Sequence, residues 1–236
     1  MNIKIIAVGS SKWERFIRKW GVSFLIGEDI LFDTFGDPDV FLRNIKKYKI
    51  SLNKIKHIII SHNHWDHISG LWNIINKCKD LTIYICSNLQ QDTKERIKSF
   101  GARVVEVDKP TRITDTICTT SELKGEYEGK IIYEQSLVIK TMKGLTVITG
   151  CAHPGITTII DNVRKHFYEQ IYLIAGGFHL KDESQQGIQS IISAFKIYQV
   201  EKVMSMHCTG RLATKLFKKE YGNNFIKAVA GSFIEV

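Results

Sequence analysis

Short apolar segments alternate with polar ones along the chain, and their two periods predict strands mixed with helices. Ile3–Val8, Val22–Ile26 and Ile30–Asp33 have the length and the β-branched content of strands, and the last two form a hairpin around a Gly-Glu-Asp turn. Asp37 and Pro38, followed by apolar residues at helical spacing, predict a helix. No proline-rich or low-complexity linker divides the sequence, so we expect one layered α/β domain over residues 1–236.

The same patterns continue to the end of the sequence. We expect further helices at Ile68–Lys77, Asn88–Ser99, Ile156–Phe167, Ser184–Tyr198 and Leu212–Tyr221, with Asp182 as the cap of the one that begins at Ser184. We expect further strands at His57–Ile60, Leu81–Cys86, Arg103–Val107, Ile113–Thr119, Ile131–Lys140, Leu145–Thr149, Ile171–Ile174, Lys202–Ser205 and Phe225–Val229.

Four of the expected strands end in a cluster of titratable residues. The clusters read SHNHWDH, TGCAHPG, AGGFHL and SMHCTG, and each follows an apolar run directly. Strand ends on one edge of a sheet converge in space, so four distant segments can supply a single site. Six of the eight histidines lie in these clusters, which makes a structural role for each of them separately a weaker explanation: His62, His64, His67, His153, His179 and His207.

The spacing within the first cluster favours metal ligation. In an extended segment, residues i and i+2 face the same side, so His62 and His64 can bind one cation together. Asp66 and His67 follow after a change of direction and can address a second position. Imidazole suits zinc, iron, nickel or manganese, and a carboxylate adds harder ligand character. The alternative for Asp66 is the N-cap of the following helix.

These motifs resemble the metallo-β-lactamase superfamily of binuclear hydrolases. HxHxDH at a strand end, a later strand-end histidine and a last histidine near the C-terminus carry the resemblance. The stretches SFLIGEDILFDT, SHNHWDHISGL, GLTVITGCAHPGI, GGFHL and HCTG are similar to a small cytoplasmic branch of metal-dependent hydrolases resembling dihydropterin ribofuranosyl-aminobenzene phosphate synthase. The resemblance implies a four-layer αββα sandwich of the metallo-β-lactamase type.

The resemblance also implies two divalent metal ions, taken as zinc with manganese or iron as alternatives. Asp33 would hydrogen-bond a ligand histidine and fix its tautomer; its alternative role is that of a turn residue. Asp66 would also act in catalysis by orienting the nucleophile. The first metal would be held by His62, His64 and His153, and the second by Asp66, His67 and His207.

One position departs from the superfamily pattern. Where most members have a bridging aspartate, this sequence has His179 in GGFHL. The two nitrogens of an imidazole point apart, so a neutral histidine cannot bridge metals only ~3.5–4 Å apart as a carboxylate does. We therefore expect His179 to bind one metal terminally or to line the pocket, with water or hydroxide as the main bridge.

The net charge of +9 favours an anionic substrate. Between the first two strands, basic residues are interleaved with Trp13, Phe16 and Trp20, whose spacing fits both a substrate lid and an amphipathic helix. Backbone N–H groups before the last helix are a further candidate phosphate site. The expected substrate-binding residues are Lys12, Arg15, Thr209 and Gly210.

The cysteines and the N-terminus indicate the compartment. Five widely spaced cysteines without a CxxC pair exclude a disulfide framework. We expect Cys208, beside His207, to be either a packed thiol or one that contacts a metal ligand. The N-terminal segment lacks signal-peptide features, and no apolar run reaches the ~20 residues of a membrane span. We expect a cytoplasmic protein without a membrane partner; assembly into a homo-oligomer is left open.

The sequence thus predicts a metal-dependent hydrolase that acts through a metal-activated water on a small anionic, phosphorylated substrate, either a phosphoester or a pterin- or nucleotide-like compound. One alternative is a metal-containing ligand-binding or sensor protein without turnover, which His179 would permit. A nuclease is the other alternative. It is supported by charge, but scattered lysines more often form a solvated surface and no nucleic-acid motif occurs, so nucleic acid is not an expected partner.

Overall fold

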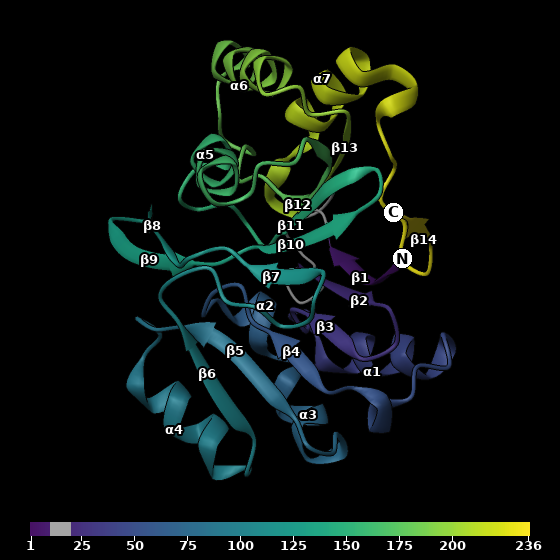
Figure 1. Cartoon of the computed structure of the whole chain (residues 1–236), viewed down its shortest axis with the longest axis vertical. Helices are drawn as coiled ribbons and strands as arrows, with labels where there is room; N and C mark the ends of the chain where they lie inside the picture. Colours follow the sequence, from purple (N-terminus) through teal and green to yellow (C-terminus); the bar gives the residue numbers. More distant parts are fainter. Residues whose placement is uncertain (10–19) are drawn as a thin grey trace. The chain divides into compact units, whose positions relative to one another are not determined.

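The computed structural model describes residues 1–9 and 20–236. The chain forms two compact units (Figure 1): the first consists of Met1–Lys109 with Val229–Val236, and the second of Pro110–Ala228. Each unit has a β-sheet with helices on its face, which confirms the expected α/β class. The prediction of a single domain over residues 1–236 stays a prediction.

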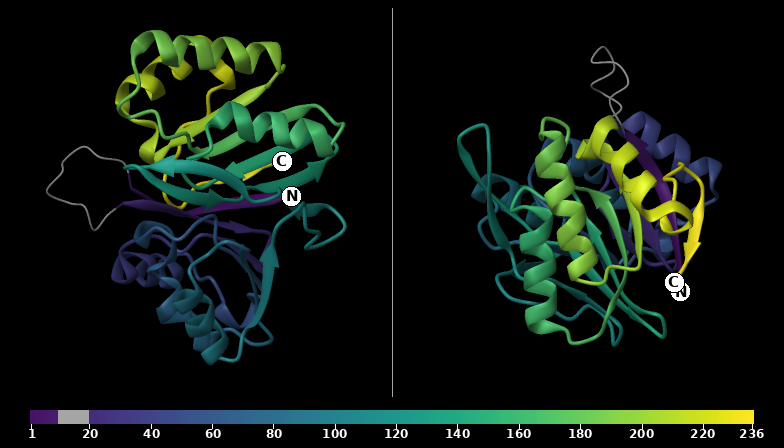
Figure 2. Two further views of the ribbon diagram at one scale, coloured as in Figure 1. Left: turned by 90° about the vertical axis from the view of Figure 1, so that its left-hand side faces the viewer. Right: turned by 90° about the horizontal axis from the view of Figure 1, so that it is seen from above.

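The first unit is built on a mixed sheet. Its described strands are ordered β14-β1-β2-β3-β4-β5-β6, with antiparallel pairing from β14 to β3 and parallel pairing from β3 to β6. The two chain ends meet at β14, where the Met1 amino group donates to the Val236 carbonyl at 2.6 Å (Figure 2). The strands are β1 (Asn2–Gly9), β2 (Gly21–Ile26), β3 (Ile30–Phe32), β4 (His57–Ile59), β5 (Thr82–Cys86), β6 (Arg103–Val107) and β14 (Phe233–Glu235).

Helices cover one face of this sheet. Phe41 and Ile45 of α1 and Ile97 of α4 pack with apolar side chains of β4 and β5 in one buried cluster. The α1 helix begins as expected, because the Asp37 carboxylate accepts hydrogen bonds from the N–H groups of the first turn. The helical segments are α1 (Pro38–Lys47), η2 (Leu52–Lys54), α2 (Trp65–Ile68), α3 (Leu71–Ile74), η3 (Ile75–Lys77) and α4 (Gln91–Ser99).

The single helix expected at Ile68–Lys77 is wrong. Helical structure begins earlier, at Trp65, and is divided into α2, α3 and η3. Gly70 lies at the first division, and its N–H donates to the Phe35 carbonyl rather than into a helix. A Cβ at Gly70 would come within 2.1 Å of the Thr34 carbonyl oxygen, so this close approach requires glycine.

The second unit has a five-stranded sheet in the order β13-β12-β11-β10-β7 and a separate β8–β9 hairpin. Strands β11, β12 and β13 are parallel, so their carboxyl ends lie on one edge. Helices α5, α6 and α7 pack on one face of the sheet through a continuous apolar cluster (Figure 2). The elements are β7 (Ile117–Thr119), β8 (Leu123–Tyr127), β9 (Lys130–Glu134), β10 (Leu137–Thr141), β11 (Gly144–Thr149), α5 (Ile156–His166), β12 (Ile171–Gly177), α6 (Gln185–Ile197), β13 (Lys202–Met206), η4 (His207–Thr209), α7 (Arg211–Tyr221) and η5 (Gly222–Asn224).

One strand expected near the end of the chain is wrong, and another is interrupted. The run Ile131–Lys140 is divided into β9 and β10: the buried Glu134 carboxylate accepts from the loop after β11, and the two buried polar residues after it belong to neither strand. Phe225–Val229 is not a strand: after η5 it forms a single bridge to Val203 instead of a ladder, and the last strand is β14.

The expected cap of α6 is also wrong. Ser184 caps the helix by accepting from the Gly187 N–H, while the Asp182 side chain is 86% exposed. A hydroxyl at the N-cap position satisfies this donor directly, so the helix needs no second cap. Among the described residues no helix is long and apolar enough to cross a membrane; α6, with 13 residues, is the longest.

Candidate metal centre

In the first unit, the loop after β4 brings two imidazoles together. His62 Nε2 lies 3.1 Å from His64 Nδ1, with the rings edge to face. Two nitrogens that ligate one tetrahedral zinc at ~2.0–2.1 Å lie about 3.3 Å from each other. The observed separation therefore fits joint ligation of one cation by His62 and His64.

A buried carboxylate determines which ring nitrogens of His62 and His67 carry a proton. Asp33, which follows β3 directly, accepts from the Ser61 N–H and the Ser61 hydroxyl, both at 2.7 Å. Its Oδ2 also lies 2.6 Å from His67 Nδ1, which is the contact to a ligand histidine that the resemblance implied. Because the Ser61 hydrogen points to Asp33, its oxygen accepts from His62 Nδ1 at 2.9 Å. The hydrogen-bond pattern thus leaves Nε2 of both His62 and His67 without a proton in their neutral forms.

This tautomer creates a demand for positive charge. His67 Nε2 lies 3.2 Å from Asp66 Oδ2, so two acceptor atoms face each other in a buried place. Burial lowers the pKa of His67, but the charges of Asp66 and Asp33 and the hydrogen bonds to both outweigh it and hold the pKa well above its ordinary value. A proton or a metal cation satisfies the pair, so the residues present fit a divalent metal.

In the second unit, the expected histidines follow three neighbouring parallel strands. His153 follows β11, His179 follows β12 and His207 follows β13. The rings of His153 and His179 are 4.4 Å apart between centroids, and the Tyr127 ring of β8 lies 5.2 Å from the first and 5.4 Å from the second. The Nδ1 atom of His179 is buried and has no hydrogen-bond partner among the described residues. It is therefore available as a donor atom for a ligand.

Several of these residues have left-handed backbone. The φ angles are 54° at Asp33, 63° at Ala152, 51° at His179 and 53° at His207. Residues with a Cβ seldom adopt this conformation, and each costs of order 1–3 kcal/mol. Residues in this conformation cluster at functional sites. Here they lie in the loops that directly follow the strands.

Two thiols accompany these histidines. Cys151 Sγ lies 3.2 Å from His207 Nε2, and Cys208 contacts both Cys151 and His179. Burial raises the pKa of Cys208, but the hydrogen bond to Cys151 and the neighbouring imidazoles of His207 and His179 outweigh it, so the pKa is well below its ordinary value. Burial lowers the pKa of His179, while the Cys208 contact raises it to a net value above the ordinary one. Both thiols therefore make polar contacts with the histidines that follow β12 and β13.

Glu134, at the end of β9, was missed in the sequence. Its buried carboxylate accepts from the N–H groups of Cys151, Ala152 and His153, each at 2.8 Å. It thereby fixes the loop that carries His153. The signal was the polar triplet Glu134-Gln135-Ser136, which interrupts an apolar run.

The expected substrate-binding residues are partly described. Thr209 is buried, and its hydroxyl donates to the Met206 carbonyl and accepts from the Phe178 N–H, so its side chain supports the fold. Gly210 has φ 78° and precedes α7, where a Cβ would come within 2.5 Å of Lys181. Lys12 and Arg15 lie outside the described residues, and their role stays a prediction.

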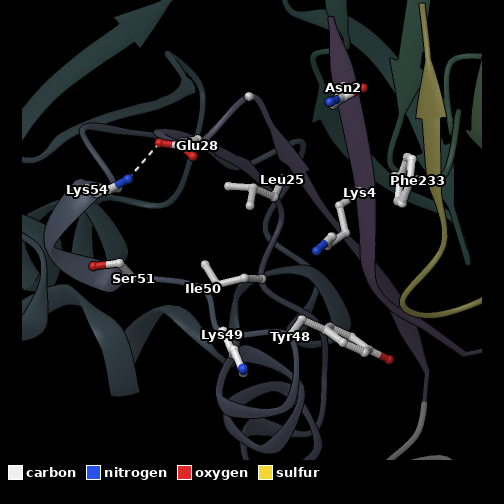
Figure 3. A pocket seen from close by; sticks show the side chains of 11 residues that line it. Asn2, Lys4, Leu25, Glu28, Tyr48, Lys49, Ile50, Ser51, Lys54 and Phe233 are labelled. Atoms are coloured by element: carbon white, nitrogen blue, oxygen red, sulfur yellow. Dashed lines mark hydrogen bonds and ion pairs between the residues drawn. The ribbon is translucent and has the colours of Figure 1, made fainter.

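A separate cavity of about 350 Å³ opens in the first unit (Figure 3). It lies by the turn between β2 and β3, at the end of β3 opposite to Asp33, and Lys4, Tyr48 and Lys49 line it. Lys54 forms an ion pair with Glu28 at its rim, at 2.7 Å. None of the described candidate metal ligands lines this cavity.

Comparisons with known proteins identify the superfamily of this chain. The sequence model of the metallo-beta-lactamase superfamily matches residues 21–161. The 7,8-dihydropterin-6-methyl-4-(beta-D-ribofuranosyl)-aminobenzene-5'-phosphate synthase of Methanocaldococcus jannaschii is 30% identical, over 93% of this chain and 91% of that protein. A ribonuclease Z of Borrelia duttonii is 41% identical over 145 residues, which are 60% of this chain and 40% of that protein.

A solved structure is similar along the whole chain. It is a metal-dependent hydrolase of the beta-lactamase superfamily, 28% identical, with a TM-score of 0.81 over 100% of this chain and 99% of that one. Human tRNase Z, short form, has the same fold at 13% identity and a TM-score of 0.61. These likenesses confirm the expected metallo-β-lactamase type of fold.

Proposed function

This chain belongs to the metallo-beta-lactamase superfamily, and on that premise we propose that it is a metal-dependent hydrolase of a small, anionic, phosphorylated substrate. The observation that carries the proposal is the buried pair of Asp66 Oδ2 and His67 Nε2, two acceptor atoms 3.2 Å apart whose arrangement suits a metal cation. Members of the superfamily typically supply that cation as a divalent metal.

In this proposal two divalent ions, zinc or else manganese or iron, are held as the family resemblance implies. When bound, such ions supply the acidity that makes a water molecule a nucleophile near neutral pH. His179 serves as a terminal donor or lines the pocket. The proposed ligands are His62, His64 and His153 for one ion and Asp66, His67 and His207 for the other.

The chain's own residues hold protons at defined atoms. Asp33 keeps the proton of His67 on Nδ1 and, through the Ser61 hydroxyl, that of His62 on Nδ1. Both Nε2 atoms then remain available as ligands. Asp66 accepts a hydrogen bond from the attacking water and orients it toward the substrate, which is its proposed catalytic role.

A phosphorylated substrate is favoured by charge and by a relative. The net charge of +9 attracts anions. The relative that is 30% identical is named as the synthase of a 5'-phosphate compound. Lys12, Arg15 and the backbone N–H groups at Thr209 and Gly210 are the proposed phosphate contacts. A cytoplasmic location, a phosphoester reaction and the oligomeric state remain predictions.

The test combines metal content with turnover. Purified protein reconstituted with zinc or manganese is expected to bind close to two ions per chain and to hydrolyse a chromogenic phosphodiester. Asp66→Asn should lower kcat by about 10²–10⁴-fold. The control is Asp182→Asn, an exposed carboxylate that should leave activity and metal content unchanged. Tight binding of a phosphorylated ligand without hydrolysis under any metal would replace the hydrolase with a metal-containing sensor.

A nuclease is the second candidate. The 41% identity to a ribonuclease Z over 145 residues favours it, although those residues are only 40% of that protein. Cleavage of structured RNA by the zinc-loaded protein, abolished in Asp66→Asn and faster than hydrolysis of small phosphodiesters, would establish this alternative.

A further inference from the structure

Two cysteines stand among the histidines of the second unit, and the metal ligands inherited from the family do not use them. We propose that Cys151 and Cys208, together with His179, bind a thiophilic divalent cation as a thiolate site. This inference rests on the proposed function only in that the protein binds a metal. The three side chains all belong to the second unit.

The donor atoms lie within reach of one ion. The two sulfurs and a ring nitrogen of His179 are all within 4.8 Å of one another. In a tetrahedral zinc site with Zn–S ~2.3 Å and Zn–N ~2.0–2.1 Å, two sulfurs are about 3.8 Å apart and a sulfur and a nitrogen about 3.5 Å. Small side-chain rotations therefore suffice to close the set around a cation.

The fold brings these donors together by its parallel strands. Cys151 follows β11, His179 follows β12 and Cys208 follows β13, and these three strands are neighbours in the sheet. Gly177, at the end of β12, leaves the space that the second thiol occupies, because a Cβ there would lie 2.6 Å from Cys208 Sγ. A larger residue at that position would displace the thiol.

A purely apolar role does not account for this arrangement. A packed cysteine is a small hydrophobe that needs only apolar neighbours. Cys151 instead has its sulfur 3.2 Å from His207 Nε2, and His179 keeps a buried Nδ1 that has no hydrogen-bond partner among the described residues. The cluster thus holds two thiols and two imidazoles, and one of the imidazoles has a buried nitrogen without a hydrogen bond. This composition indicates a bound metal ion.

The class of ligand follows from the donors. Thiolates with imidazole select zinc, cobalt and cadmium over magnesium or calcium. Each thiol loses its proton to solvent as its metal–sulfur bond forms, and no electron is transferred. This site would also explain why the chain has His179 in GGFHL, where the family has a bridging carboxylate. The imidazole nitrogen lies beside the sulfurs of Cys151 and Cys208 and can bind the same ion.

The first test uses the unmodified protein. X-ray absorption spectroscopy of zinc bound to the wild type should show a sulfur shell at ~2.3 Å in addition to the nitrogen and oxygen shell. Zinc bound through nitrogen and oxygen alone would overturn this inference and leave the proposed hydrolase standing. Protein that binds no zinc would overturn both.

The second test assigns the sulfurs. Cobalt-loaded wild type should show a sulfur-to-cobalt charge-transfer absorption, which Cys151→Ser and Cys208→Ser each reduce by about half, because each removes one of two thiolates. Cys118→Ser is the matched control: this thiol is on β7 of the same unit and outside the cluster. Equal loss in Cys118→Ser, or an unchanged absorption in both site variants, would refute the assignment.

Discussion

At the scale of single residues, a buried carboxylate organises the histidine-bearing loop of each unit. Asp33 accepts from Ser61 and His67 in the first unit, and Glu134 accepts three backbone N–H groups in the second. Neither side chain is exposed, so each carboxylate acts through hydrogen bonds. Charge-assisted hydrogen bonds of this kind are about twice as strong as neutral ones.

Glu134→Gln is the sharpest single-residue prediction. The amide keeps the shape but turns its NH₂ group toward the His153 N–H or the Cys151 N–H, so at least one donor loses its acceptor. We expect the free energy of unfolding to fall by about 2–3 kcal/mol and zinc affinity to fall with it. Urea denaturation and competition with a chelator measure the two effects.

The control for that change is Glu126→Gln, on the exposed face of the neighbouring strand β8. It should alter neither quantity. If Glu134→Gln is as stable as the wild type and binds zinc equally well, the carboxylate is not what fixes the Cys151–His153 loop.

At the scale of elements, the β8–β9 hairpin was not foreseen, and glycine permits its position. Gly125 on β8 approaches the backbone of His153 and Pro154 so closely that a Cβ would lie 2.5 Å from the His153 carbonyl carbon. The hairpin thereby also brings Tyr127 to the rings of His153 and His179.

Gly125→Ala should therefore push the hairpin away from the His153 loop. Because backbone atoms cannot yield as a flexible side chain does, we expect a destabilisation of about 1–3 kcal/mol and a weaker metal site. Thermal unfolding and metal competition provide the measurements, with Glu126→Ala on the same strand as control. A Gly125→Ala protein with unchanged stability would show that the loop has room to move.

A second element-scale prediction concerns α4 and β6. The buried Lys94 amine donates to the Ser87 carbonyl and to Glu106 Oε2, both at 2.6 Å, and this hydrogen bond lowers the pKa of Glu106. A lowered folded pKa contributes stability that is present above the unfolded value of ~4.3 and lost as pH falls through the folded value.

Glu106→Gln should remove that contribution. Because the Glu106 side chain is 39% exposed, solvent screening limits the loss at pH 7 to less than about 1 kcal/mol, and the variant should lose less stability than wild type between pH 5 and pH 3. Urea midpoints across this range test it. Parallel curves for both proteins would show that the ion pair does not contribute.

At the scale of the whole molecule, metal binding should be coupled to stability. The Asp66–His67 pair and the histidine clusters offer ligand atoms that the unfolded chain does not hold together, so a metal ion that binds only the folded chain stabilises it. Free zinc at 100 times its Kd should add about 2.7 kcal/mol.

Calorimetry of the zinc-loaded and chelator-treated protein gives the readout, and the Tm should fall on metal removal. His57→Ala offers a control histidine, because it lies at the start of β4, away from the metal loop, and should keep the zinc-dependent shift. Identical Tm values with and without zinc would contradict metal binding by the folded chain.

The sequence by itself determined most elements and the type of chemistry. Strands and helices such as β6 and α1 follow from local periodicity, and metal-ligating residue types at strand ends are visible along the chain. The predicted element boundaries were wrong where a residue hydrogen-bonds to a partner far away in the sequence, as Gly70 does with Phe35 and Glu134 with Cys151.

Tertiary structure alone decided which atoms meet. Asp33 and His67 are 34 residues apart in sequence, and Cys151 and His207 are 56 apart. Periodicity reports which face of an element is buried, but contacts of this separation depend on how strands are ordered in the sheet. The HxHxDH motif was therefore visible in the sequence, whereas the thiols beside His179 and His207 became part of the site only through the parallel order of β11, β12 and β13.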